Sequence, residues 1–260
     1  MILKVMTVTL EKFFEENKKV AIALSGGVDS IFLMHMAKKC GAEVIAYFAK
    51  SEFQPDFELC DARLAAKNAG VPLRIIELSA LGNTDIAKNG EDRCYWCKHL
   101  IMNAICNAAS EDGISVICDG TNATDDISDR PGWRAIREFS VRSPLRECGI
   151  AKTEIRRRAR EEGLSVWNKC SYACLATRVK CGERIEREKL SKIESSEELL
   201  AGLGFSDFRV RVSENCARLE LHGADKELYL GEKENIMRVL DGYFDEITED
   251  FEVRDERFID

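Results

Sequence analysis

The segment SGGVDS, residues 25–30, has residue types and spacing suited to binding phosphate. Its two adjacent glycines let backbone N–H groups approach an anion without a Cβ in the way, and its two serine hydroxyls can donate to phosphate oxygens. The carboxylate of Asp29 can hold a magnesium ion that bridges those oxygens. The candidate nucleotide-binding residues of this loop are Ser25, Gly26, Gly27, Val28, Asp29 and Ser30.

The segments on either side of this loop favour an anion site over a generic glycine turn. The apolar run VAIAL, residues 20–24, predicts a buried parallel strand, and residues 30–39 predict a helix whose N-terminus favours negative charge. Ligands bind at the carboxyl ends of such strands. No glycine-lysine-serine ending follows, so the loop lacks the lysine that holds a transferring γ-phosphate in Walker-type loops.

Strand and helix patterns go on alternating along the chain, which predicts a doubly wound α/β domain with a parallel sheet. The alternation covers most of the first two thirds of the sequence. Further strands are expected at residues 43–49, 73–78 and 115–120, and helices at 7–17, 56–68, 95–110 and 152–163.

The last third of the chain predicts a second, smaller α+β domain. Helices are expected at about residues 186–201 and 224–240, and strands at 208–212, 217–221 and 246–253. Between the domains, the sequence has no clear period and predicts a loop that carries cysteines. The expected parts are an α/β domain over 1–167, a cysteine-bearing linker over 168–182 and a small α+β domain over 183–260.

Composition narrows the class of protein further. The formal net charge of −8 argues against a broad electrostatic grip on nucleic acid. No apolar run approaches 18 residues, so we expect a cytoplasmic protein that does not contact membranes. Eleven cysteines in such a chain indicate reduced thiols, metal ligands or reactive sulfur, not a disulfide framework. A homo-oligomer is expected because symmetric assemblies are common among enzymes.

The loop at residues 25–30 resembles the SGGxDS signature of the PP-loop family of ATP pyrophosphatases. The resemblance implies that Mg²⁺-ATP binds, that pyrophosphate leaves and that AMP is transferred to a substrate oxygen. The segment DGTNATDDISDRPG (119–132) resembles another part of such enzymes, as do SPL and GIAKTEIR further on. By that resemblance Gly120 lies near the adenine, and Asp126, Arg130 and Lys152 face the phosphates or the substrate. Alternatively, the acidic residues form a solvated loop and Lys152 begins an exposed helix.

Four finer matches resemble one branch of this family, the LarE-type sulfur transferases. Those enzymes adenylate the carboxylates of a pyridinium biscarboxylic acid mononucleotide and replace an oxygen by sulfur, which makes the organic part of a nickel-pincer cofactor. In sacrificial members, the cysteine in the position of Cys174 donates its own sulfur. The matching segments are RCYWCK (93–98), WNK (167–169), ACLATR (173–178) and LGFSDFRVR (203–211).

Cys170, Cys174 and Cys181 follow the spacing CxxxCx6C, which resembles the cluster-containing members of that branch. Three thiolates on one short segment can hold three irons of a [4Fe-4S] cluster and leave the fourth iron open to an added sulfide. A zinc site without a visible fourth ligand is one alternative, and a single reactive cysteine with two bystanders is the other. The six cysteines outside this trio and the CxxC pair at 94 and 97 are expected to be small core residues.

Four residues are candidates for contacting a mononucleotide substrate: Trp96, Arg209, Arg211 and Glu220. Trp96, between Cys94 and Cys97, can stack on a pyridinium ring or simply cap the core. The two arginines are two positions apart on a predicted strand, so their side chains share one face. Paired guanidiniums suit a phosphate monoester, although a solvated strand face explains them equally well. Glu220 on the adjacent strand is a possible partner.

The sequence therefore predicts an ATP-dependent, AMP-forming sulfur transferase in which Asp29, Lys152 and Cys174 act in catalysis. A carboxylate attacks the α-phosphate, and sulfur from the cysteine segment then displaces AMP. A tRNA thiolase and an ammonia-using synthetase are the rival enzymes, and a nucleotide-binding or iron–sulfur scaffold is the non-enzymatic rival. The acidic charge disfavours the first, and an ammonia-using enzyme has no need of three cysteines.

Overall fold

The structure is a computed structural model that describes residues 9–126 and 131–251. The tail at 252–260 and Arg130 therefore lie outside the described residues. The chain forms two compact units. The first unit contains the chain up to Ser51 together with residues 56–78 and 94–169, and the second contains residues 52–55, 79–93 and the chain from Cys170 onward.

A four-stranded parallel sheet forms the centre of the first unit and confirms the predicted α/β class. The strand order is β3-β2-β1-β4, so the chain moves outward from β1 in one direction and then returns to its other side. The crevice between the ends of β1 and β4 is therefore the point at which the topology reverses, where open α/β sheets bind ligands. The strands are β1 (Lys19–Ala23), β2 (Glu43–Lys50), β3 (Leu73–Glu77) and β4 (Ile117–Cys118).

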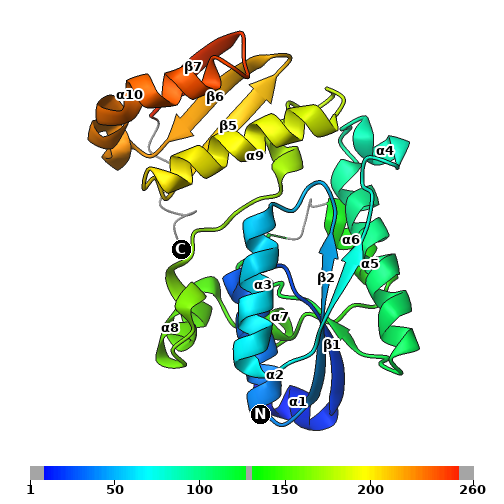
Figure 1. Cartoon of the computed structure of the whole chain (residues 1–260). Helices are drawn as coiled ribbons and strands as arrows, with labels where there is room; N and C mark the ends of the chain where they lie inside the picture. The colour runs from blue at the N-terminus through cyan, green and yellow to red at the C-terminus, as the bar shows by residue number, and fades with distance from the viewer. Residues whose placement is uncertain (1–8, 127–130, 252–260) are drawn as a thin grey trace, which may run out of the picture. The chain divides into compact units, whose positions relative to one another are not determined.

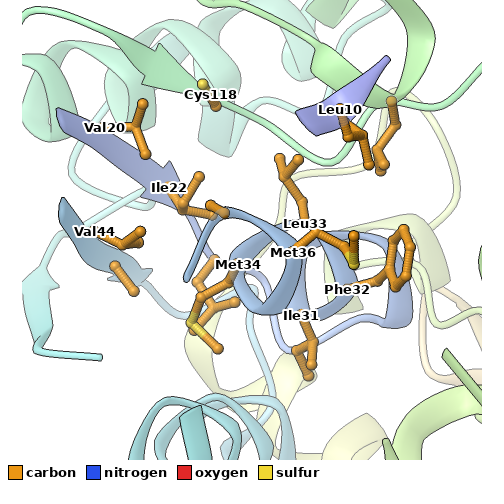
Figure 2. Close-up of a cluster of buried hydrophobic side chains, with 14 of the residues drawn as sticks. Leu10, Val20, Ile22, Ile31, Phe32, Leu33, Met34, Met36, Val44 and Cys118 are labelled. Atoms are coloured by element: carbon orange, nitrogen blue, oxygen red, sulfur yellow. The ribbon is translucent and has the colours of Figure 1, made fainter. Parts of the chain in front are cut away.

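Side chains alternate across the sheet and build two apolar cores, one on each face. Val20 and Ile22 of β1 pack with Leu33 on one face, as Figure 2 shows, whereas Ala21 packs with Ile105 on the other. Helices cover both faces (Figure 1). Residues of α1 (Leu10–Glu16), α2 (Val28–Lys39), α3 (Asp56–Ala69), α7 (Pro144–Glu147) and α8 (Lys152–Glu161) contribute to the first core, and those of α5 (Arg93–Glu111) and α6 (Pro131–Glu138) to the second.

Helix α2 is the most deeply buried helix of this unit because most of its circumference is apolar. Asp29 in its first turn and Lys38 and Lys39 in its last turn complement the helix dipole. The helix begins directly after the glycine loop, so the sheet and the core fix the position of the loop. Within the described ranges, no helix combines the length and the apolar content that crossing a bilayer requires.

The second unit is the smaller α+β part, with a mixed three-stranded sheet ordered β5-β6-β7. Strands β5 and β6 form an antiparallel hairpin whose turn places Glu214 in the left-handed region at φ +54°, whereas β6 and β7 are parallel. Figure 1 shows α9 and α10 beside this sheet. The elements are α4 (Thr84–Ala87), η2 (Leu175–Arg178), α9 (Arg187–Gly202), β5 (Phe208–Ser213), β6 (Cys216–Leu221), η3 (Gly223–Asp225), α10 (Lys226–Leu240) and β7 (Glu246–Asp250).

Some short elements differ from the sequence expectation. The strand expected at residues 115–120 is only two residues long, because the backbone N–H of Asp119 donates to the carbonyl of Arg142 and leaves the ladder with β1. The short helices α4, α6 and α7 were not expected, nor were the 3₁₀ turns η1 (Ser165–Asn168), η2 and η3. Elements of three to eight residues carry too few turns for a hydrophobic period to appear.

Replacing Leu33 by alanine tests the core that supports the loop. Leu33 is fully buried in α2, so we expect Leu33→Ala to lower the free energy of unfolding by about 2–5 kcal/mol. Leu64→Ala in α3, where the side chain is 53% exposed, is the matched control and should change stability by less than about 0.5 kcal/mol. All three tryptophans lie in the first unit, so urea unfolding followed by tryptophan fluorescence reports on that unit. Equal effects of the two variants would contradict this packing.

Candidate functional site

The loop between β1 and α2 is a compact hydrogen-bonded turn. The Ser30 hydroxyl donates to the carbonyl of Gly27 at 3.1 Å and accepts from the backbone N–H of Ser25 at 3.1 Å. The two serine hydroxyls lie 3.1 Å apart. Gly27 is the N-cap of α2 and provides no side-chain cap. The first-turn N–H groups of the helix and the serine hydroxyls thus converge on one place, which suits an anion.

Two glycines are required here by close backbone approach. Gly26 has φ +78°, and a Cβ at this residue would lie 2.4 Å from the carbonyl oxygen of Glu58. A Cβ at Gly120 would lie 2.8 Å from the backbone nitrogen of Ser30. The residue after β4 therefore packs directly against the N-terminus of α2. The structure brings Gly120 together with the loop at the crevice between β1 and β4.

Asp29 and Lys152 form an ion pair beside the loop. The Lys152 ammonium donates to Asp29 Oδ2 at 2.6 Å, and the side chains are 13% and 23% exposed, so Lys152 does not simply begin an exposed helix. Burial raises the pKa of Asp29, and the charge of Lys152 opposes that rise. Asp29 Oδ1 is buried without a hydrogen-bond partner among the described residues. A buried carboxylate oxygen of this kind suits a hard cation such as Mg²⁺.

The loop after β4 is ordered by its own polar side chains. Asp119 accepts from the Ser143 hydroxyl at 2.7 Å, and Asp125 accepts from the backbone N–H of Asn122 at 2.9 Å. The charge of Asp125 also contributes to the raised pKa of Asp29. Sequence reasoning selected Asp126, which is exposed, and assigned no role to Asp125. The spacing of Asn122 and Asp125 was the available signal, because such residues cap turns with their side chains.

Lys169 also reaches the loop and was assigned no role from the sequence. Its ammonium donates to the carbonyl of Gly26 at 3.0 Å and to Asp61 Oδ2 at 2.5 Å. More than 100 residues separate Lys169 from each of these partners. No local spacing could reveal this contact.

The three cysteines of the proposed sulfur site lie in the second unit and are free thiols. Cys170 and Cys181 are exposed, and Cys174 is half-buried at the N-cap of η2. The Cys174 carbonyl accepts from the backbone N–H of Thr177 at 2.9 Å and from its hydroxyl at 2.7 Å. Among the residues that the structure describes, no three His, Cys, Asp or Glu side chains are gathered as metal ligands. The thiols are thus in one segment but not around one point.

Asn89 fixes the later part of the cysteine segment. It is fully buried, has φ +56°, and its side-chain amide donates to the carbonyls of Val179 and Lys180 at 3.3 and 2.8 Å. The Asn89 carbonyl in turn accepts from the Gly182 N–H at 2.8 Å and from the Cys181 thiol at 3.5 Å. Both ends of one residue therefore position the segment that carries Cys181.

Arg209 and Arg211 hold the same segment around Cys174. Arg209 donates to the carbonyl of Ser171 at 2.7 Å, and Arg211 donates to the carbonyl of Thr177 at 2.8 Å. Arg211 also forms a bidentate pair with Glu220 at 3.0 Å. Arg209 is only 9% exposed, so the strand face that the arginines share is not a plain solvated one.

A buried ion pair lies beneath these contacts. Arg178 and Glu197 pair at 2.7 Å with side chains 1% and 5% exposed, and Glu197 also accepts from the Val210 N–H and the Tyr172 hydroxyl. The Arg178 guanidinium lies 4.7 Å from the Tyr172 ring centroid. Removing one partner of such a pair leaves an uncompensated buried charge. The pair therefore fixes Tyr172, two residues before Cys174.

Trp96 and the CxxC pair lie in the first turn of α5, in the first unit. Trp96 is half-buried and makes an edge contact with Tyr95 at 4.9 Å between centroids, so it does not cap the core. Cys94 is exposed and Cys97 is half-buried.

The expectation that the other six cysteines are core residues is only partly correct. Cys118 and Cys148 are buried, and burial raises the pKa of Cys148 to about 11. Cys40 and Cys106 are half-buried, and Cys60 and Cys216 are exposed. The expectation was wrong for the last two because a helix or a strand at the edge of a unit has an outer face that sequence context does not identify.

Similarity to curated proteins extends over most of the chain. The chain is 36% identical to an uncharacterized protein of Synechocystis sp., over 82% of this chain and 80% of that protein. It is 31% identical to the pyridinium-3,5-bisthiocarboxylic acid mononucleotide synthase of Lactiplantibacillus plantarum, over 82% and 78%. A tRNA-specific 2-thiouridylase of Pseudothermotoga lettingae is 32% identical over only 39% of this chain and 36% of its own. No family model matches the chain.

A parallel sheet with this glycine and serine loop at its topological reversal defines an ATP-using enzyme of the PP-loop class. Within that class, the chain belongs to the LarE-type family of sulfur transferases, because it is related over most of its length to the L. plantarum synthase.

Replacing Gly120 by alanine tests the contact between the β4 end and α2. Since the new Cβ would lie 2.8 Å from the Ser30 nitrogen, we expect Gly120→Ala to displace the loop and to weaken ATP binding by about tenfold or more. Gly202→Ala is the control, because nothing lies within 4 Å of its added Cβ and the backbone is helical. ATP titration calorimetry on both variants measures the effect. Normal ATP affinity in Gly120→Ala would refute the assigned contact.

Proposed function

We propose that this enzyme adenylates a carboxylate of a pyridinium biscarboxylic acid mononucleotide and replaces one of its oxygens by sulfur. The observation that carries this proposal is the relationship to a bisthiocarboxylic acid mononucleotide synthase over about four fifths of both chains. The glycine loop with its buried, unpartnered Asp29 oxygen supports the ATP-dependent half of the reaction. The free cysteines of one segment support the sulfur-transferring half.

In the first step, a carboxylate oxygen of the substrate attacks the α-phosphorus of ATP. The bond from that phosphorus to the bridging oxygen breaks, pyrophosphate leaves, and an acyl-adenylate forms. The N–H groups of the loop and the Ser25 and Ser30 hydroxyls are placed to stabilise the charge that builds on the leaving group. Lys152 balances the charge of Asp29. Asp29 would hold Mg²⁺, which neutralises phosphate charge when bound.

In the second step, a sulfur nucleophile adds to the acyl carbon, AMP leaves, and a thiocarboxylate forms. If Cys174 is the donor, its sulfur first forms a thioester, and loss of the Cα proton with cleavage of the Cβ–Sγ bond then leaves dehydroalanine. In that case each chain acts once per sulfur.

We propose that the sulfur instead comes from sulfide, and that Cys170, Cys174 and Cys181 would hold a [4Fe-4S] cluster. The donor set suits this group because all three thiols are free and belong to one segment of one unit, although they are not gathered around one point in the structure described here. Such a cluster would leave one iron open to bind added sulfide, so the protein keeps its own sulfur. The anchored carbonyls of Ser171 and Thr177 bracket Cys174 and limit its movement.

We propose that Arg211, Glu220 and Arg209 contribute to substrate binding on the second unit, with Trp96 on the first. Arg211 is 41% exposed beside Glu220, so its guanidinium can reach a phosphate monoester without leaving its strand. Arg209 is bound to the backbone of the cysteine segment, which supports a positioning role.

Thiolation of tRNA is the second candidate and is less well supported. The similarity to a tRNA 2-thiouridylase covers less than two fifths of either chain, and the net charge of −8 works against a polyanionic substrate.

Pyrophosphate release tests the proposed function. With Mg²⁺-ATP, sulfide and pyridinium-3,5-biscarboxylic acid mononucleotide, we expect pyrophosphate, AMP and a thiocarboxylated product, measured by coupled assay and mass spectrometry. Asp29→Asn should abolish pyrophosphate release by removing the metal-binding carboxylate, whereas the surface variant Asp85→Asn should retain it. Release with tRNA but not with the mononucleotide would favour the thiolase.

Iron and sulfide analysis after anaerobic purification tests the source of sulfur. We expect about four irons per chain, bound by three cysteines and lost in Cys170→Ala, Cys174→Ala and Cys181→Ala. Cys216→Ala, which removes an exposed thiol elsewhere in the second unit, should keep its iron. If reconstituted wild-type protein holds no iron and becomes lighter by one H₂S after turnover, Cys174 is the single-use donor.

A further inference from the structure

Lys169 occupies a position at the glycine loop that the mechanism above does not use. Its ammonium lies 3.0 Å from the Gly26 carbonyl oxygen, 2.5 Å from Asp61 Oδ2 and 5.0 Å from the centroid of the Phe57 ring. The side chain is 20% exposed, so the charge is largely withdrawn from solvent but still accessible. All four residues belong to the first unit.

The backbone around Lys169 is fixed to the helix that provides Lys152. The Arg156 guanidinium of α8 donates to the carbonyls of Trp167 and Lys169, both at 2.9 Å. The first residue of the same helix, Lys152, pairs with Asp29. Helix α8 therefore places two ammonium groups against the loop, one directly and one through the segment that it holds.

The chemistry of the loop calls for such a cation. A triphosphate carries several negative charges, and this loop contains no lysine of its own. Lys152 is committed to Asp29 at 2.6 Å. An ammonium has three N–H donors, and the described residues provide Lys169 with two acceptors, Gly26 and Asp61. A phosphate oxygen can therefore become the third acceptor or replace one of the two.

We propose that Lys169 is a nucleotide-binding residue that contacts the β- or γ-phosphate of ATP, and that Asp61 holds its ammonium in place until the nucleotide binds. Lys169 thus supplies from a distant part of the chain the phosphate-binding lysine that the loop lacks. This inference rests on the proposed function only in that ATP binds at the loop. It requires neither the mononucleotide nor a sulfur donor.

The test compares ATP with AMP, which lacks the β- and γ-phosphates. We expect Lys169→Met to weaken ATP binding by about tenfold or more and AMP binding by less than about twofold, because a charged hydrogen bond is lost only with the triphosphate. Lys169→Arg should recover part of the ATP affinity, since it keeps the charge. Lys180→Met, at an exposed lysine of the second unit, is the matched control and should bind both nucleotides normally. Calorimetry in the presence of Mg²⁺ and without mononucleotide gives these affinities.

Asp61→Asn separates phosphate binding from a structural role of the ion pair. If Lys169 contacts the triphosphate, removing the competing carboxylate should leave ATP affinity unchanged or raise it. If the ion pair only stabilises the loop, Asp61→Asn and Lys169→Met should weaken ATP binding equally, which would overturn the proposal. Equal loss of ATP and AMP affinity in Lys169→Met would overturn it as well. Because no variant here is assayed for sulfur transfer, failure of this proposal is distinguishable from failure of the proposed function.

Discussion

The close approach of the β4 end to the N-terminus of α2 is the constraint on which the nucleotide site depends. Gly120 lies so near the Ser30 nitrogen that no larger residue fits, and Gly26 approaches the Glu58 carbonyl in the same way. The two contacts hold the loop from opposite sides, while the apolar cores hold the strand and the helix. The first-turn N–H groups of α2 are thereby fixed before a ligand arrives, which is the preorganisation that electrostatic catalysis requires.

Charge around this loop is balanced by residues far apart in the chain. Asp29 introduces a buried negative charge, and its raised pKa reflects the cost of that burial. Lys152 offsets this cost, and Lys169 adds a second ammonium at the Gly26 carbonyl. The site thus combines a carboxylate oxygen suited to a cation with ammonium groups suited to phosphate.

In the second unit, a different principle positions the cysteine segment. The segment has little regular structure, so its backbone carbonyls are bound by side chains of other elements: Asn89, Arg93, Arg209 and Arg211. The arginines that the sequence suggested for a phosphate are therefore also anchors of the segment around Cys174. A substrate phosphate that engages Arg211 would act on a residue already bound to the sulfur-bearing backbone.

The sequence by itself determined the α/β class, the place of the glycine loop between a strand and a helix, and the family, because alternating apolar periods and the SGGVDS motif are local patterns. Only the tertiary structure decided that Lys169 and Asp125 accompany Asp29, and that Arg209 is buried against the cysteine segment. These contacts join residues distant in sequence. They arise from how the chain returns across the sheet and from which face of each element is covered, and no local spacing records either.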